Sequence, residues 1–519
     1  MVRFINREQE LKALNAKLQA FQSDVLPEKR LFNLYGPAGI GKTALLDYFI
    51  NIQVKKQAKI PVIRIDYDDF GKLISYHENQ RQILMLLKTK TASLVNRTSA
   101  EQSLTDDTYD QQLEAIAEDL RQHASQRPLL LCFDHSDGLD EALFAWIERR
   151  LLLPLANDRP EQPVRVLCLF TSQLLLRWRQ FNVRRRVEPI EIKALDQYAT
   201  LQQALVSLAP DYAPTMQRMP SQFSDHTPYL ESTIYQFSFG LPAATQTLVE
   251  QLQAVEPVYA PEPGFEQVQL DRMRTWLDEH KATLITTITQ QIIDRVSPQI
   301  QPILQRTSET KHEWIGWNIL EAVSLLREFD VNSMRVMLGQ YNSTIFDNPS
   351  QALLLAYLRD LIETRLVIWE SSIRAYQVVA PVRQIFARQL ELHQPEQYVR
   401  MRKEAAGFYK QQVKTVVSYR HRYIIEYLFQ SIHTPAFHVD HVPALKQLLR
   451  YYLETYYGYP GSMLQARDDI RSQELALFRE DLTQDTELLD IIRGKTGSLD
   501  LIQDVVQVFH SSNITTNKV

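Results

Sequence analysis

Residues 36–43 read Gly-Pro-Ala-Gly-Ile-Gly-Lys-Thr. A glycine followed by four residues and then Gly-Lys-Thr is the pattern of a loop that binds the phosphates of a nucleoside triphosphate. In such a loop the glycines let backbone N–H groups turn toward phosphate oxygens, Lys42 supplies positive charge, and the Thr43 hydroxyl binds Mg²⁺. A helix that opens at Gly41 would add the positive end of its dipole.

The residues on either side of this loop provide the context that it needs. Residues 31–35 form a short apolar run of strand character, and residues 43–50 have the spacing of a helix. Strand, loop and helix in this order favour a working nucleotide site. The predicted contacts to nucleotide from the loop and the start of the helix are Gly36, Pro37, Ala38, Gly39, Ile40, Gly41, Lys42, Thr43 and Ala44.

Four further segments have strand character and alternate with helical segments. The strand candidates are residues 60–66, 128–134, 164–170 and 187–192, and the helical segments between them are residues 78–126 and 141–152. A continuous apolar run such as 128–134 is typical of a strand buried on both faces of a parallel sheet. Alternation of strands and helices favours right-handed crossovers. We therefore expect an α/β phosphate-loop NTPase fold with five parallel strands in the order 5-1-4-3-2.

Polar residues end two of these strands on the rim where the phosphate loop also lies. Asp134 ends the third strand, at the place of the acid that holds Mg²⁺ in phosphate-loop NTPases. We expect Asp134 and Thr43 to be the metal ligands. Thr171 ends the fourth strand, and its hydroxyl could contact the γ-phosphate or simply belong to a turn that ends the strand. Ligands of parallel sheets bind at this rim.

The remainder of the chain reads as mainly helical. The loop candidates are residues 210–228 and 258–265, and residues 361–379 alternate in the manner of a β-hairpin, such as the wing of a winged helix. Helical segments without a strict repeat follow from about residue 382. We expect a phosphate-loop domain, a small helical domain, a winged helix and an α-helical C-terminal region. The predicted bounds of these four domains are residues 1–195, 196–290, 291–390 and 391–519.

Composition narrows the class of protein. A chain of 519 residues is too long for one core, so about two to four domains are expected. A net charge of −5 argues against a nucleic-acid polycation. Cys132 and Cys168 lie in strand candidates and read as small buried hydrophobes of a reducing compartment. Apolar runs fall short of the roughly 18 residues that a membrane helix needs, so we expect a cytoplasmic protein without membrane contact. The histidines show no metal-binding spacing, and we expect no metal beyond the Mg²⁺ of the nucleotide.

Two more motifs, in order with the phosphate loop and Asp134, resemble a known family. Residues 4–11 read Phe-Ile-Asn-Arg-Glu-Gln-Glu-Leu, and residues 240–242 read Gly-Leu-Pro. The arrangement is similar to STAND-class signalling ATPases, an AAA+-related branch of phosphate-loop NTPases, over about residues 1–390. The resemblance implies that Arg7 and Ile5 lie on the adenine side of the nucleotide and that Pro242 lies against the adenine. It also implies a switch driven by ATP and ADP with Mg²⁺, acting through assembly or a protein partner.

Two positions depart from the pattern of that family. His135 stands where many relatives have a second acid after the strand-ending aspartate, and Asp137 is the candidate replacement. We therefore name Lys42, Asp134 and Asp137 as candidate catalytic residues of a weak ATPase, whose hydrolysis is expected to be slow or absent. At the wing, residues 378–380 read Val-Val-Ala, so the histidine that contacts the β-phosphate in many relatives has no counterpart.

Two alternatives belong to other classes of protein. A DNA-binding regulator would use the second helix of the winged helix, near residues 331–338, which contains Arg335 among apolar residues. DNA is therefore a less favoured partner, because a reading helix needs several basic or amide side chains. A loader or remodelling ATPase would need vigorous turnover, against which His135 argues.

Overall fold

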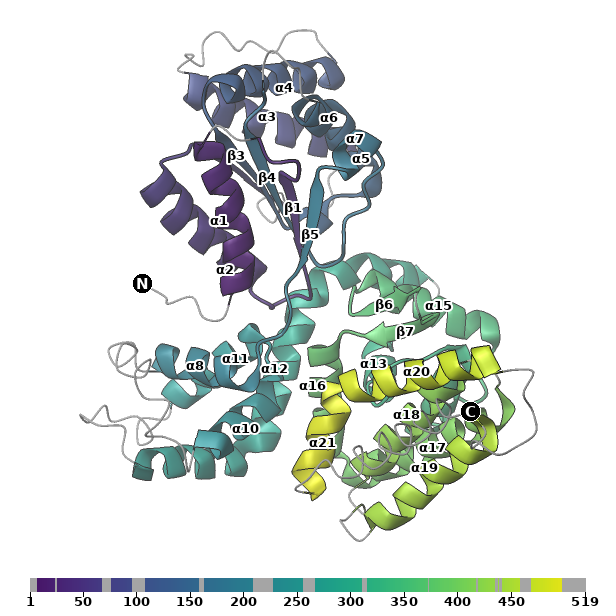
Figure 1. The fold of residues 1–519 in the computed structure, drawn as a ribbon. Helices are drawn as coiled ribbons and strands as arrows, with labels where there is room; N and C mark the ends of the chain where they lie inside the picture. The colour runs from purple at the N-terminus through teal and green to yellow at the C-terminus, as the bar shows by residue number, and fades with distance from the viewer. Residues whose placement is uncertain are drawn as a thin grey trace, which may run out of the picture. The chain divides into compact units, whose positions relative to one another are not determined.

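The computed structural model describes residues 7–23, 26–67, 76–95, 108–157, 163–208, 227–254, 267–309, 315–371, 373–416, 419–434, 437, 441–457 and 468–496. The chain divides into two compact units, Met1–Pro298 and Gln299–Val519. Unit 1 contains the sheet, and unit 2 contains mainly helices (Figure 1).

The sheet of unit 1 consists of five parallel strands in the order β2-β3-β4-β1-β5. The strands are β1 (Leu31–Tyr35), β2 (Val62–Asp66), β3 (Leu129–Asp134), β4 (Val166–Ser172) and β5 (Val187–Glu191). Every residue of β3 and β4 is buried, as a strand covered on both faces requires. Read from β5, the order is 5-1-4-3-2, so the predicted fold class and strand order are confirmed.

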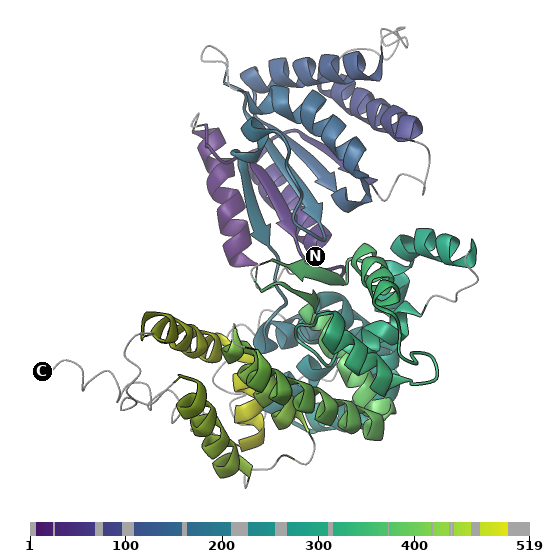
Figure 2. The same cartoon turned by 90° about the vertical axis from the view of Figure 1, so that its right-hand side faces the viewer.

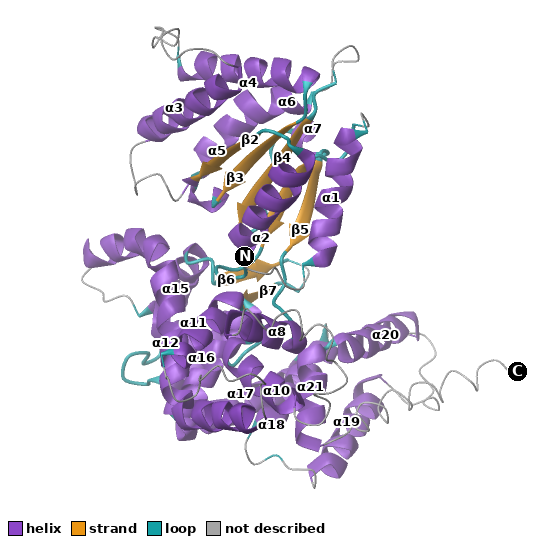
Figure 3. Ribbon diagram, turned by 90° about the vertical axis from the view of Figure 1, so that its left-hand side faces the viewer, coloured by secondary structure: helices purple, strands orange, loops and turns teal. Residues whose placement is uncertain are grey.

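Helices cover both faces of this sheet (Figure 3). One face packs against α1 (Glu8–Gln22) and α2 (Lys42–Tyr48), which continues as a π-helical segment, Phe49–Ala58. The core on this side includes Leu14, Leu18, Phe21, Phe32, Phe49, Cys132 and Leu169. The other face packs against α3 (Tyr76–Val95), α4 (Tyr109–Gln126), α5 (Glu141–Ile147), α6 (Leu153–Ala156) and α7 (Phe181–Arg184). Apolar side chains that alternate along the strands therefore enter two separate cores.

A helical segment completes unit 1. It comprises α8 (Gln197–Leu208), α10 (Thr227–Ser238), α11 (Pro242–Gln253) and the first part of α12 (Gln267–Glu309). The buried side chains of these helices include Leu201, Ile234, Phe237, Leu248 and Leu252. Most of the two predicted loops lies outside the described residues, but α10 begins at Thr227, within the predicted loop at 210–228.

Unit 2 begins with helices, continues with a hairpin and ends with helices (Figure 2). Its helices before the hairpin are α13 (Gly316–Val323), α14 (Val331–Tyr341) and α15 (Gln351–Glu363). Strands β6 (Val367–Glu370) and β7 (Ala375–Val378) pair antiparallel, where the sequence predicts a hairpin. The helices that follow are α16 (Ala380–His393), α17 (Pro395–Thr415), α18 (Arg420–His433), α19 (Val442–Tyr457), α20 (Asp468–Gln484) and α21 (Thr486–Thr496). The winged helix itself stays a prediction.

The helices and cysteines of the described residues agree with the composition. None of the helices in the described part of the chain is long and apolar enough to span a bilayer. Cys132 and Cys168 are free thiols buried in β3 and β4. Burial raises the pKa of the Cys168 thiol to about 12, so this thiol is an inert part of the core.

Candidate nucleotide-binding site

The phosphate loop connects β1 to α2 and has the backbone that its glycines allow. Gly41 precedes α2 with φ of 94°, in the left-handed region that side chains disfavour. No side chain caps α2. The first N–H groups of the helix therefore remain for another acceptor, which in this kind of loop is a phosphate oxygen.

The side chain of Lys42 folds back into the loop. Its ammonium lies 2.8 Å from the carbonyl oxygen of Gly36 and 3.0 Å from that of Pro37. Only 8% of the residue is exposed. Burial lowers the pKa of Lys42 to about 8, although Asp137 and Asp134 act to raise it. A phosphate oxygen that took the place of the two carbonyls would give the ammonium a charged partner.

Asp134 lies at the carboxyl end of β3 and is fully buried. Its Oδ1 accepts hydrogen bonds from the hydroxyl of Thr171 and from the backbone N–H of His135 at 3.2 Å. The Thr43 hydroxyl lies 3.3 Å from the same oxygen. Thr43, Asp134 and Thr171, three predicted site residues, therefore meet at one point. An oxygen pair from Thr43 and Asp134 fits the preference of Mg²⁺ for hard ligands.

Arg64, which the sequence analysis did not single out, is the counter-ion of this acid. One guanidinium nitrogen pairs with Oδ2 of Asp134, and the other pairs with Asp47. Asp66 Oδ2 lies 3.6 Å from the guanidinium nitrogen of Arg64 that pairs with Asp134. Burial acts to lower the pKa of Arg64, but Asp134 and Asp47 together raise it. The sequence could have pointed to Arg64, because it lies between Ile63 and Ile65 in a predicted strand. A charged side chain at such a position needs an oppositely charged partner on the sheet.

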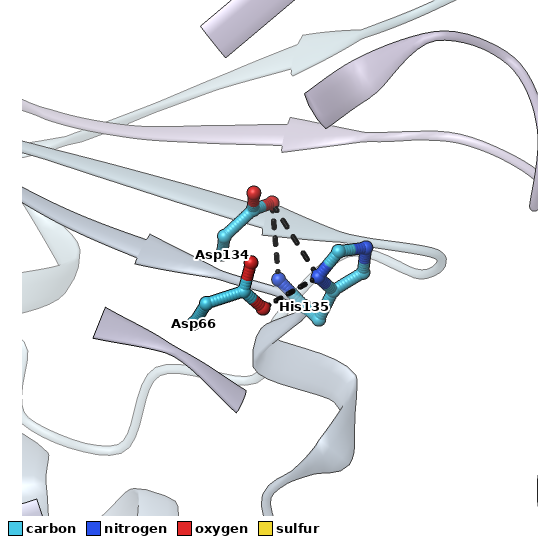
Figure 4. A group of neighbouring side chains, drawn as sticks. All are labelled: Asp66, Asp134 and His135. Carbon is cyan, nitrogen blue, oxygen red and sulfur yellow. Dashed lines mark hydrogen bonds and ion pairs between the residues drawn. The ribbon is translucent and has the colours of Figure 1, made fainter. Parts of the chain in front are cut away.

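His135 joins Asp66 to Thr43. Its Nδ1 lies 2.8 Å from Oδ1 of Asp66 (Figure 4). Its Nε2 lies 3.3 Å from the Thr43 hydroxyl. Asp66, Asp134 and His135 have potential metal-ligand atoms within 4.8 Å of one another. His135 thus belongs to a group of residues that could hold a metal ion, at the place where the Mg²⁺ of the nucleotide is expected. Spacing along the chain could not reveal the group, because the parallel pairing of β2 with β3 sets Asp66 opposite Asp134.

Asp137, the candidate replacement for the missing acid, lies on a short 3₁₀ turn after His135. Its Oδ1 accepts a hydrogen bond from the backbone N–H of Gln173, at the end of β4. The carboxylate therefore ties two loops of the rim together, while its charge still acts on Lys42.

Arg7 and Pro242 both lie close to the phosphate loop. Arg7 is buried and donates to the carbonyl oxygens of Ile40, at 3.2 Å, and Lys193, at 2.8 Å. Pro242 begins α11, and its Cγ would be 3.9 Å from a Cβ placed on Gly41. Ile5, the other predicted adenine contact, lies outside the described residues.

The helical segment of unit 1 contacts the loop directly at Gly39. The backbone N–H of Ala243 donates to the carbonyl oxygen of Gly39 at 3.1 Å. A Cβ at Gly39 would be 2.8 Å from the Cβ of Ala243 and 3.9 Å from a guanidinium nitrogen of Arg295. Only glycine therefore permits this approach. Arg295 on α12 was also missed, since one arginine in a long helix is no signal by itself.

The loop at residues 36–43, the strand order of the sheet and Asp134 at the end of β3 are together typical of a phosphate-loop nucleotide-binding domain. Residues 3–167 match the family model described as an AAA ATPase domain. Over these residues the chain is similar to AAA ATPase domains, and this similarity implies nucleotide binding.

The chain is also similar to several solved structures. The ORC2 protein of Aeropyrum pernix, in ADPNP and ADP complexes, is 13% identical, with 75% of this chain and 94% of that chain covered and a TM-score of 0.39. A STAND protein with a tetratricopeptide repeat sensor from Pyrococcus horikoshii is 14% identical, with 97% and 72% covered and a TM-score of 0.29. A RuvB mutant of Thermotoga maritima is 12% identical, with 72% and 93% covered and a TM-score of 0.33. None of the curated proteins compared with the chain matches it.

Proposed function

We propose that this chain is a nucleotide-dependent molecular switch of the STAND type, which binds ATP or ADP with Mg²⁺ and hydrolyses ATP slowly. The loop backbone and Lys42 hold the phosphates, and Thr43 and Asp134 hold the metal. Thr171, hydrogen-bonded to Asp134, is the residue that responds to the γ-phosphate. Bound Mg²⁺ offsets the phosphate charge and orients the β- and γ-phosphates.

The main support for a switch is a backbone hydrogen bond that joins the phosphate loop to the helical segment of unit 1. The Ala243 N–H donates to Gly39 inside the loop, and α11 begins one residue earlier, at Pro242. Gln203 of α8 donates to the Pro242 carbonyl at 3.2 Å, so the contact continues into the segment. A ligand that changes the loop therefore changes the support of α11, and ATP and ADP differ in their contacts there.

Two basic residues frame the nucleotide in this proposal. Arg7 fixes the loop through Ile40 and the connection to the helical segment through Lys193, and its stem lies on the adenine side with Pro242. Arg295, within reach of Gly39, is the cation of the helical segment that senses the terminal phosphate. Because ATP carries one more phosphate than ADP, an arginine there discriminates between them electrostatically.

Slow hydrolysis follows from the residues after Asp134. Asp137 is hydrogen-bonded to the backbone of Gln173, and His135 occupies the place of the second acid. Lys42, Asp134 and Asp137 remain the catalytic candidates. The output is assembly or binding of a protein partner, through the predicted winged helix and the C-terminal helices. DNA finds less support, because Arg335 is the one basic residue in α14.

The decisive experiment identifies the nucleotide that the purified chain carries. Acid release followed by chromatography is expected to give ADP or ATP in near-equal amount to the protein, and none from Lys42→Ala. Hydrogen exchange with added ADP and ATP–Mg²⁺ then tests the switch: α11 amides should differ between the two nucleotides, and less so in Arg295→Ala. Lys56→Ala, an exposed lysine after α2, is the matched control. A chain that carries and binds no nucleotide would refute the proposal.

A further inference from the structure

The imidazole of His135 is oriented by a carboxylate, as in metal-binding histidines. Asp66 ends β2 opposite Asp134, and its Oδ1 lies 2.8 Å from Nδ1 of His135 (Figure 4). Histidines that bind metals usually donate their other ring N–H to a carboxylate, which fixes the tautomer and makes the ligand nitrogen more basic. An ionised carboxylate only accepts hydrogen bonds, so Nδ1 carries a hydrogen. In the neutral ring, which is the form that binds a metal, Nε2 then presents the lone pair.

Nε2 lies next to Thr43, one of the two proposed metal ligands. Nε2 lies 3.3 Å from the Thr43 hydroxyl, which itself lies 3.3 Å from Oδ1 of Asp134. Neighbouring ligands of an octahedral ion with bonds of about 2.1 Å are about 3 Å apart. The Thr43 hydroxyl therefore has about this spacing to Nε2 on one side and to Asp134 Oδ1 on the other, so an ion bound by the lone pair of the Thr43 hydroxyl lies next to Nε2.

The charges around this point favour a cation. Asp47, Asp66 and Asp134 bring three carboxylates, against the guanidinium of Arg64 and the ammonium of Lys42, whose pKa Asp134 acts to raise. Arg64 pairs with Oδ2 of Asp134 and is nearest to Oδ2 of Asp66, so the Oδ1 atoms remain on the side of His135. The counter-ion and the imidazole therefore use different edges of the same carboxylates.

From this geometry we infer that His135 Nε2 is a metal ligand of the nucleotide site and that the site prefers Mn²⁺ or Co²⁺ over Mg²⁺. Mg²⁺ favours an oxygen-only shell, whereas imidazole suits transition metals. Asp66 is the positioning residue that holds the ring. The inference rests on the proposed function for the phosphates as further ligands of the metal. Binding of the metal by His135 can be tested without nucleotide.

Pulsed electron paramagnetic resonance of Mn²⁺ bound to the full chain tests the ligand directly. Protein labelled with ¹⁵N-histidine is expected to show a ¹⁵N coupling to Mn²⁺, with and without ADP. Labelling only histidine separates the imidazole from the nitrogens of adenine. The coupling is expected to disappear in His135→Asn, since asparagine best tolerates the φ of 52° at this position. His280→Asn, which removes an exposed imidazole on α12, should leave it unchanged.

Nucleotide affinities measured with each metal provide the second readout. ADP is expected to bind at least about tenfold more tightly with Mn²⁺ than with Mg²⁺, and both His135→Asn and Asp66→Asn should remove most of this ratio. Circular dichroism spectra and urea midpoints close to those of the parent chain show that the variants fold. ADP binding without a ¹⁵N coupling or a metal preference would overturn the inference and leave the proposed function standing. If no nucleotide binds, a ¹⁵N coupling with Mn²⁺ alone supports the histidine ligand, and its absence overturns it.

Discussion

Each unit of this chain encloses a cluster of charged side chains, but the two clusters have different surroundings. The Asp134 cluster of unit 1 consists of Asp134, Arg64, Asp47, Asp66 and His135. The Arg327 cluster of unit 2 consists of Arg327, Arg383, Glu426, Asp485 and Glu487. Both pair arginine with several acids, so the presence of buried charge does not separate a ligand site from a structural one.

The Arg327 cluster is closed. Arg327 donates to Glu426 at 2.7 Å and to Asp485, and its guanidinium lies 4.2 Å from the ring centre of Phe429. The side chains of Arg327, Glu426 and Asp485 are only 15%, 6% and 13% exposed. Burial acts to lower the pKa of Arg327, but Glu426 and Asp485 outweigh it and raise the pKa. Its charges therefore neutralise one another in a largely buried setting.

The Asp134 cluster is open on one side. Asp134 is fully buried, whereas the side chains of its neighbours Arg64 and His135 are 28% and 33% exposed. The phosphate loop lies next to it, through Thr43. Access and an adjacent loop of backbone N–H groups therefore distinguish the proposed ligand cluster from the structural one.

The largest expected effect is the loss of stability when Arg327 is removed. Arg327→Ala leaves Glu426 and Asp485 without their guanidinium, and we expect unit 2 to lose about 3–5 kcal/mol of its free energy of unfolding. Urea unfolding followed by circular dichroism measures it. Nucleotide affinity should stay within about twofold, since unit 1 keeps its site.

The control for that variant is Arg359→Ala. Arg359 pairs with Asp360 at 3.3 Å, but its side chain is 64% exposed. We expect a loss below about 0.5 kcal/mol, as for other exposed pairs. A similar cost for Arg327→Ala would mean that its cluster is no more structural than a surface ion pair.

Lys42→Met should show the reverse of Arg327→Ala, with a loss of nucleotide affinity and no loss of stability. The buried ammonium has backbone carbonyls as hydrogen-bond acceptors, so its removal is expected to leave the stability of unit 1 unchanged or slightly raised. Affinity for ATP should fall about 100-fold, because a charged contact to the phosphates is worth about 1.5–3 kcal/mol. Calorimetric titration measures the affinity, with Lys56→Met as control. A destabilised variant that still binds ATP would place Lys42 among structural charges.

The Asp134 cluster also shows which parts of the site could be predicted from the sequence. Strand order, phosphate loop and the acid at the end of β3 could be predicted, because periodicity and a fixed motif encode them locally. Arg64 and Asp66 could not, because their partners come from other strands, and register rather than spacing brings Asp66 opposite Asp134. His135 was noticed only as a missing acid. Its role depends on that register and on a backbone φ of 52°.

Removing Arg64 tests how far the Asp134 cluster behaves like the closed one. Arg64→Gln takes the guanidinium from a fully buried carboxylate, and we expect the ligand-free unit 1 to lose about 1–3 kcal/mol. Saturating nucleotide with a divalent metal should restore part of this loss, because the metal supplies positive charge to Asp134. Differential scanning calorimetry with and without ligand measures both, and Arg81→Gln, which alters an exposed pair with Glu78, is the control. No loss in Arg64→Gln would show that Asp134 needs no counter-ion.

The smallest expected effect is a pH dependence with two opposite signs. Burial lowers the pKa of Lys42 from 10.5 to about 8, so between these values the unfolded chain holds a proton that the folded chain has lost. Its contribution to stability therefore rises with pH in this window, whereas below it both states are protonated and the burial penalty is complete. Nucleotide binding needs the ammonium, so affinity should fall by up to about tenfold per pH unit above that pKa. Urea midpoints and ATP affinities from about pH 7 to 9 measure both trends, and Lys42→Met should remove both. If stability and ATP affinity both fell as the pH rises, Lys42 would not be the phosphate-binding residue proposed here. A Lys42 ammonium that stabilises the fold would make both quantities decline together.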